Sequence, residues 1–132
     1  MLKTGMFHVK PIGYVEHEEG FSRVVVFPEY GEGLDGIERF SHIILLCWMH
    51  KAERDVLKVH PRPRPELFLG VFATRSPSRP NPIGLYTVKL LSRIGLELRI
   101  QPIDAYAGTP VLDIKPYIPG LDSIPEACSG WF

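Results

Sequence analysis

The stretch that most constrains the fold is the proline-rich run over residues 70–85. Three prolines fall within six of its residues, at positions 77, 80 and 82. Proline removes a backbone donor, fixes φ and pushes the preceding residue away from the α region. We therefore expect residues 76–84 to form a stiff, irregular loop. Such a loop can hold polar groups ready for an anionic or planar ligand. The polar side chains that it presents are Arg75, Ser76, Ser78, Arg79 and Asn81.

Short apolar segments separated by turn residues predict strands along most of the chain. Strands are expected at residues 7–15, 22–27, 41–50, 67–74, 84–91, 95–101 and 111–114. Residues 41–50 form a continuous apolar run, which is typical of a strand buried on both faces. Glycines between residues 30 and 40 limit any helix there to about one turn. The pattern predicts a mainly β fold, a small antiparallel barrel with short helical segments, as one domain over residues 1–132.

The charge composition restricts how this chain can bind a nucleic acid. Fifteen basic and fifteen acidic side chains give a net charge of zero. A global basic field is therefore absent, and any contact with nucleic acid must come from a local patch. The candidate patch consists of His60, Arg62, Arg64, Arg75 and Arg79.

Cysteine usage and the apolar runs indicate a cytoplasmic protein. Cys47 and Cys128 give neither a disulfide framework nor the spacing of a metal site, so we expect two reduced thiols and no metal. The longest apolar run, residues 43–49, is too short to cross a bilayer, so no membrane contact is expected. No glycine-rich dinucleotide motif joins a strand to a helix, which indicates a non-Rossmann fold.

Two motifs, the proline loop at residues 70–85 and a second run at residues 108–119, resemble the signature of the TsaA-like (YaeB-like) family. The resemblance extends to residues 11–13, 27–30 and 33–42. Characterised members of this family are TrmO-type tRNA adenine-N6 methyltransferases. The resemblance implies S-adenosyl-L-methionine as cofactor, a tRNA substrate modified in its anticodon loop, and a homodimer with the cofactor site near the interface.

The resemblance also implies which residues contact the cofactor. They are His50, Lys51, Arg75, Leu85, Asp113, Ile114, Lys115 and Pro116. The planar fork of Arg75 suits the cofactor carboxylate. Asp113 and Lys115 lie two residues apart, so we expect them on one face of a strand, where the simpler interpretation is an exposed ion pair.

Two residues are candidates for the chemistry itself. The exocyclic amine of adenine is a poor nucleophile, and the amide oxygen of Asn81 could accept its hydrogens. Asp113 is the competing candidate as proton acceptor. Arg62, Arg64 and Arg79 are expected to hold the phosphates of an RNA loop.

One family segment, a Pro-Arg-Gln sequence after the first strand, is missing from residues 15–23. Three explanations follow: His17 or Arg23 replaces it, cofactor affinity is reduced, or the substrate is not tRNA. The alternative functions are an S-adenosylmethionine-binding enzyme for a small molecule or another RNA, and a non-catalytic RNA- or nucleotide-binding module.

Overall fold

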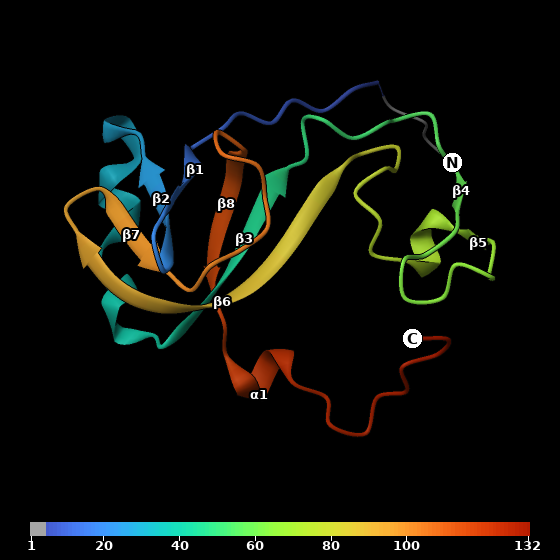
Figure 1. Cartoon of the computed structure of the whole chain (residues 1–132). Coiled ribbons are helices and arrows are strands. Elements are labelled where there is room, and N and C mark those ends of the chain that lie inside the picture. Colours follow the sequence, from blue (N-terminus) through green and yellow to red (C-terminus); the bar gives the residue numbers. More distant parts are fainter. Residues whose placement is uncertain (1–4) are drawn as a thin grey trace.

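Six antiparallel strands form a closed barrel in the computed structural model, which describes residues 5–132 (Figure 1). Around the barrel the strands follow the order β1-β2-β7-β6-β3-β8, with β8 returning to β1. Their bounds are β1 Gly13–Glu18, β2 Phe21–Val26, β3 His42–Trp48, β6 Ile83–Ile94, β7 Glu97–Ile100 and β8 Pro110–Pro116. The mainly β barrel expected from the sequence is confirmed.

The barrel interior is built from alternate residues of each strand. Val24, Ile43, Leu45 and Leu98 are fully buried, because successive side chains of a strand point to opposite faces. Each such side chain contributes about 1.5 to 3 kcal/mol by leaving water. Burial also raises the pKa of Cys47 to about 11, so that its thiol stays protonated at neutral pH. Both cysteines are free thiols, as expected.

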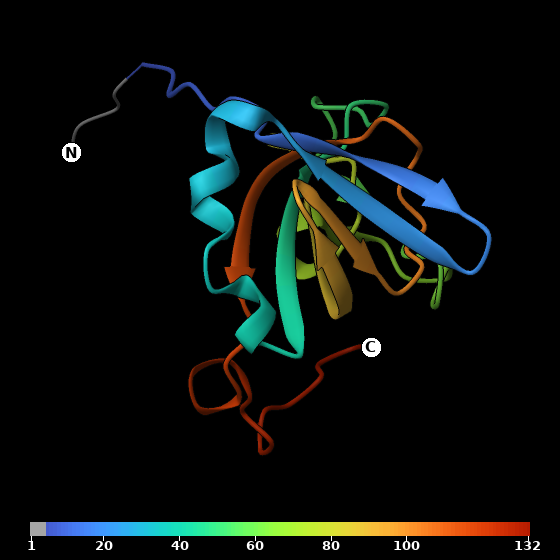
Figure 2. The same ribbon diagram turned by 90° about the vertical axis from the view of Figure 1, so that its left-hand side faces the viewer.

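Short helices cover one side of the barrel beside β8 (Figure 2). They are η1 (Pro28–Leu34) and η2 (Ile37–Arg39), and Leu34 buries its side chain in the core. Gly36 separates the two at a φ of 89°, a left-handed conformation that glycine adopts without strain. The limit of about one turn expected from the glycine spacing holds for η2 but is wrong for η1, which contains Gly31 and Gly33 and forms about two turns of 3₁₀ helix. No helix within residues 5–132 is long and apolar enough to cross a membrane.

Three expectations about the strands are corrected by the structure. The first strand begins only at Gly13, after Pro11, whose nitrogen cannot donate to a ladder. Gly13 also lies so close to β2 that a Cβ atom there would stand 2.2 Å from the Val25 carbonyl oxygen. In place of a strand over residues 67–74 there are β5 (Leu69–Gly70) and the helical turn η3 (Val71–Ala73), because β5 pairs with β4 (Lys58–Val59), which is equally short.

The third correction concerns β3, which is buried fully on one face only. Its inward side chains have no exposed surface, whereas Ile44, Leu46 and Trp48 on the outer face are half-buried. The continuous apolar run therefore supplies both a core and an outer apolar face.

Residues 49–82 connect β3 to β6 and form a projecting segment that stands beside the barrel (Figure 1). It contains β4, β5, η3 and the proline loop. After β8 the chain forms the short helix α1 (Pro119–Asp122) and then a tail that ends on this segment. There the indole Nε1 of Trp131 donates a hydrogen bond to the Ala73 carbonyl oxygen at 2.6 Å.

Candidate functional site

The outer face of three neighbouring strands, β6, β3 and β8, brings several predicted cofactor residues together. In the strand registers, Leu46 of β3 lies opposite Leu85 on one side and Asp113 on the other. One row further along, Ile44 lies opposite Lys115. Residues that lie opposite one another share a face of the sheet. Leu85, Asp113 and Lys115 therefore lie on one surface, which we call the outer face.

A β-bulge turns Asp113 toward the outer face. Cys47 lies opposite Val111 and Leu46 lies opposite Asp113, so Leu112 is an extra residue in β8. Without this insertion Asp113 would follow the inward direction of Val111, because alternate residues of a strand share a face. Lys115 Nζ then lies 3.0 Å from Asp113 Oδ2, which confirms that the pair shares one face. Both side chains are about half exposed, so this pair contributes less than about 1 kcal/mol to stability.

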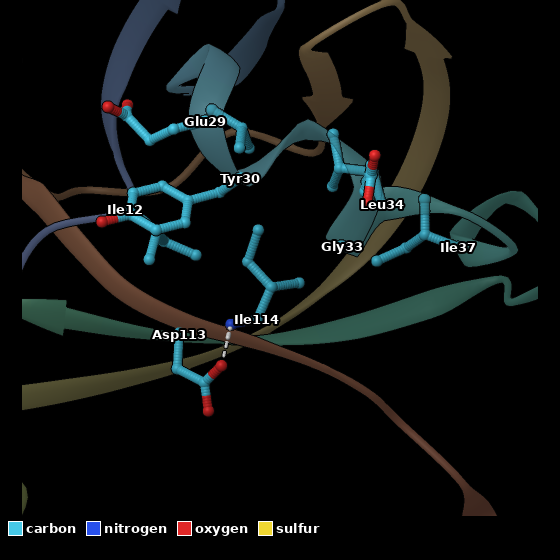
Figure 3. A pocket seen from close by; sticks show the side chains of 10 residues that line it. Ile12, Glu29, Tyr30, Gly33, Leu34, Ile37, Asp113 and Ile114 are labelled. Atoms are coloured by element: carbon cyan, nitrogen blue, oxygen red, sulfur yellow. Dashed lines mark hydrogen bonds between the residues drawn. The ribbon is translucent and has the colours of Figure 1, made fainter.

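Ile114 points the other way, into a cleft of about 380 Å³ between η1 and β8 (Figure 3). Tyr30 and Leu34 reach into the same cleft; Asp113 also lines it, but its carboxylate points to the other side of the β8 ribbon. Only the backbone of Ile114 is therefore available to a molecule on the outer face. Its N–H donates to Asp113 Oδ1 at 2.9 Å, which fixes the orientation of that carboxylate.

A second cleft of about 440 Å³ adjoins this one, and Ile114 and Pro116 are among the residues that line it. Neither is lined by His50, Lys51, Arg75 or Leu85. Most of the predicted cofactor residues thus lie on an open surface rather than in a cavity. A ligand bound there would stay accessible to water unless a second surface covers it.

The proline loop is irregular over residues 74–82 and is joined to the end of β3; it ends two residues earlier than expected, because Ile83 and Gly84 already pair with β3 as part of β6. The N–H of Met49 donates to the Pro82 carbonyl oxygen at 2.7 Å. Further along, the N–H of Arg79 donates to the Glu53 carbonyl oxygen, and the N–H of Glu53 donates to Ser78 Oγ. These bonds place His50 and Lys51, both exposed, next to the end of the loop.

Two side chains that the sequence analysis did not identify contact the predicted residues. Arg54 donates from Nε to the Pro80 carbonyl oxygen at 2.9 Å and from Nη2 to Asn81 Oδ1 at 3.3 Å. The Asn81 oxygen keeps a second lone pair for another donor. Lys51 Nζ lies 4.3 Å from the centre of the Tyr106 ring. Both contacts join positions far apart in sequence, for which the chain gives no local signal.

The arginines of the projecting segment differ in what they contact. Arg62 and Arg75 are exposed, and within residues 5–132 neither makes a hydrogen bond or an ion pair. Arg64 pairs with Glu66 at 2.7 Å between Nε and Oε2. Arg79 is half-buried and directs Nη1 toward carbonyl oxygens of its own loop. Arg62, Arg64 and Arg75 are thus presented to solvent, and Arg79 is turned inward.

Comparison with known proteins identifies the family. The family model described as the tRNA-methyltransferase O N-terminal domain matches residues 9–123. The chain belongs to this family. A crystal structure of TrmO from Pseudomonas aeruginosa matches 97% of the chain with a TM-score of 0.78 and 34% sequence identity. The chain spans 63% of that structure.

Two archaeal proteins resemble this TrmO-type domain over most of its length. An S-adenosyl-L-methionine-binding protein of Archaeoglobus fulgidus is 43% identical over 130 residues, which cover 88% of the chain and 93% of that protein. A protein of Methanocaldococcus jannaschii named "Probable S-adenosyl-L-methionine-binding protein" is 48% identical over 122 residues, covering 89% and 97% respectively. The chain spans only 32% of a second, longer relative from A. fulgidus.

Neither of the proposed substitutes for the missing family segment is free in this TrmO-type domain. The two ring nitrogens of His17 contact Ser22 Oγ and the Ala105 carbonyl oxygen. Arg23 pairs with Glu97, and its hydrogen bond lowers the pKa of that carboxyl. Both residues lie near the turn of the β1–β2 hairpin, whereas β1 pairs with β8 at its other end, through Gly13 and Tyr14. Replacement of the segment by His17 or Arg23 therefore has no support in the geometry.

Proposed function

We propose that this domain is an S-adenosylmethionine-dependent methyltransferase that modifies N6 of an adenine in a tRNA anticodon loop. Membership of the tRNA-methyltransferase O family and the names of the archaeal relatives support this activity. The observation that carries the proposal is the outer face, where the strand registers and the bulge gather Leu85, Asp113 and Lys115.

The residues at this face fit the chemical groups of the cofactor. Leu46 and Leu85 offer apolar surface to the adenine ring, and Asp113 offers acceptors to the ribose hydroxyls. Arg75 lies on the projecting segment rather than on this face, and its free guanidinium suits the methionine carboxylate, which takes two parallel hydrogen bonds from such a fork. We assign hydrogen bonds with the edge of the adenine ring to backbone groups of residues 114–116. When bound, S-adenosylmethionine supplies an activated methyl group.

The remaining task of the protein is to align and activate the target amine. In the proposal Asn81 Oδ1 accepts a hydrogen bond from the exocyclic amine, which localises the nitrogen lone pair. Arg54 supports this role, because its hydrogen bond to Oδ1 fixes which end of the Asn81 amide faces the substrate. Asp113 remains the alternative proton acceptor, with Lys115 as its ion-pair partner.

The distribution of charge supports an RNA substrate. Residues 56–82 carry five basic side chains and one acidic one, a net charge of +4. The rest of the chain carries ten basic and fourteen acidic side chains, a net charge of −4. A polyanion is thus attracted to one part of an otherwise acidic molecule. We assign the phosphate contacts to Arg62 and Arg64, which are exposed, rather than to Arg79, which is half-buried.

The open outer face supports a homodimer. Ile83 and Leu85 of β6 are 40% and 46% exposed, and Leu46 and Trp48 of β3 lie beside them in the registers. A second copy related by a two-fold axis would cover this apolar surface and close the cofactor site. The proposal therefore places the cofactor between two copies of the outer face.

Methyl transfer from labelled S-adenosylmethionine to bulk RNA tests the proposed function. We expect label in the tRNA fraction and, after digestion to nucleosides, an N6-methylated adenosine. Cofactor binding by calorimetry without labelled RNA would point instead to a small-molecule substrate. RNA binding without any affinity for the cofactor would indicate a non-catalytic binding module.

A further inference from the structure

Arg75 lies in a short backbone stretch whose carbonyl oxygens accept hydrogen bonds from two side chains, one of the same loop and one of the C-terminal tail. The guanidinium of Arg79 donates through Nη1 to the carbonyl oxygens of Thr74 at 3.1 Å and Ser76 at 2.9 Å. These are the residues immediately before and after Arg75. One planar group therefore bridges the backbone on both sides of the predicted carboxylate-binding residue.

A second contact on the same stretch comes from the C-terminal tail. Trp131 Nε1 donates to the Ala73 carbonyl oxygen at 2.6 Å, across 58 residues of sequence. Residues 120–130 are all exposed, whereas Trp131 is half-buried. The tail thus makes few contacts along its length and is closed at its end by this hydrogen bond. Residues 73–76 are therefore held by Arg79 of the loop and by Trp131 of the tail.

We propose that Arg79 and Trp131 are positioning residues that fix the backbone on both sides of Arg75, so that its guanidinium meets the cofactor carboxylate. The inference rests on the proposed function and assigns Arg79 a role other than phosphate binding. Arg75 has no partner of its own within residues 5–132, so its direction depends on the backbone that carries it. A misplacement of about 1 Å at such a group is enough to weaken its effect strongly.

Substitution of Arg79 is expected to leave the domain folded, because the second half of the loop is held independently. The N–H of Glu53 donates to Ser78 Oγ, and Arg54 donates to the Pro80 carbonyl oxygen. Lysine is the informative replacement at position 79, since it keeps the charge but its ammonium ends one atom short of Nη1, the nitrogen that donates to both carbonyl oxygens.

Calorimetric titration with S-adenosylmethionine tests the proposal in Arg79→Lys and Trp131→Phe, each in the wild-type and the Arg75→Ala background. We expect Arg79→Lys to weaken binding about tenfold or more, and Trp131→Phe to weaken it by a smaller factor. In the Arg75→Ala background both effects should disappear, because residues that act through one partner are not additive. Arg39→Lys, at an exposed arginine of η2 to which no binding role is assigned, serves as control and should bind as the wild type does.

Equal effects with and without Arg75 would overturn the proposal, as would unchanged affinity in Arg79→Lys. If Arg79→Lys binds cofactor and tRNA normally while Arg79→Ala loses only tRNA affinity, Arg79 is a phosphate contact instead.

Amide hydrogen exchange without ligand gives an independent measurement. The N–H groups of Ser76 and Ser78, bonded to Thr74 Oγ1 and Ser76 Oγ, should exchange faster in Arg79→Lys. If the wild-type protein binds no cofactor, the proposed function fails. Unchanged exchange at these amides would overturn the positioning role of Arg79, whether or not the wild-type protein binds the cofactor.

Discussion

The barrel interior and the projecting segment, residues 49–82, are held by different interactions. In the barrel, Ile43, Leu45 and Leu98 have no exposed surface, and non-directional burial of apolar area supplies the stability. In the segment, Arg54 and Arg79 donate to loop carbonyl oxygens and few side chains are fully buried. Burial in the barrel depends on the area removed from water, whereas the hydrogen bonds of the segment also fix the direction of polar groups. This difference separates residues that maintain the fold from residues that serve binding.

Leu45→Ala should produce the largest effect, on the barrel side of the comparison. The substitution removes a fully buried side chain and leaves a cavity, so the free energy of unfolding should fall by about 2 to 5 kcal/mol. Urea denaturation measures this loss. Leu91→Ala on β6, where the side chain is 49% exposed, should change the same quantity by about 0.5 kcal/mol or less. Similar losses in both variants would show that the interior is not the main source of stability.

Arg75→Ala should give the converse result, a loss of cofactor binding without a loss of stability. Removal of a charge-assisted partner should cost roughly 2 to 4 kcal/mol of binding free energy. The thermal midpoint should stay unchanged, since the exposed side chain makes no hydrogen bond or ion pair within the described residues. Calorimetry with S-adenosylmethionine measures the affinity. A normal dissociation constant would remove Arg75 from the site.

The barrel was predictable from the sequence because its signals are local. Alternation of apolar residues and turn positions such as Gly95, at a φ of 61°, mark strands and their connections within a few residues. The continuous run in β3 was misleading, because a strand buried on one face and apolar on the other has the same composition as one buried on both.

The site was less predictable because its geometry depends on contacts between distant positions. The bulge at Leu112 becomes visible only when β8 is paired with β3, and it decides that Asp113 and Lys115 face outward. The bond from Arg54 to Asn81 joins residues that are 27 apart, and no periodic pattern encodes it. A motif therefore identifies which residues take part, but the registers determine which of them meet.

Asn81→Ala tests whether the segment acts in the reaction or only in binding. If Oδ1 accepts from the target amine, the interaction strengthens as the nitrogen becomes pyramidal. The substitution should then lower kcat and kcat/KM together by about a hundredfold. The dissociation constant for S-adenosylmethionine should barely change. A variant that keeps its kcat and raises only the KM for the cofactor would show that Asn81 shapes the pocket, and Asp113 would become the leading proton acceptor.

The smallest effect is expected for the double variant Arg62→Ala/Arg64→Ala, which tests the charge difference between the two regions. Removing one phosphate-binding side chain lowers the slope of log K against log salt by about one, so removing two should lower it by about two. Filter binding of tRNA over a range of salt concentrations measures the slope, and cofactor affinity should remain unchanged. The double variant Lys10→Ala/Arg39→Ala removes the same charge on the barrel side, so it controls for net charge alone.

Glu66→Gln sharpens this last prediction, because Glu66 already occupies part of the positive surface. The hydrogen bond from Arg64 lowers the pKa of Glu66, so this carboxylate is ionised at neutral pH and competes with phosphate for the guanidinium. Its neutralisation should therefore strengthen tRNA binding and steepen the salt dependence. An identical slope in all these variants would mean that Arg62 and Arg64 face solvent in the complex, and the charge difference would then serve solubility rather than recognition.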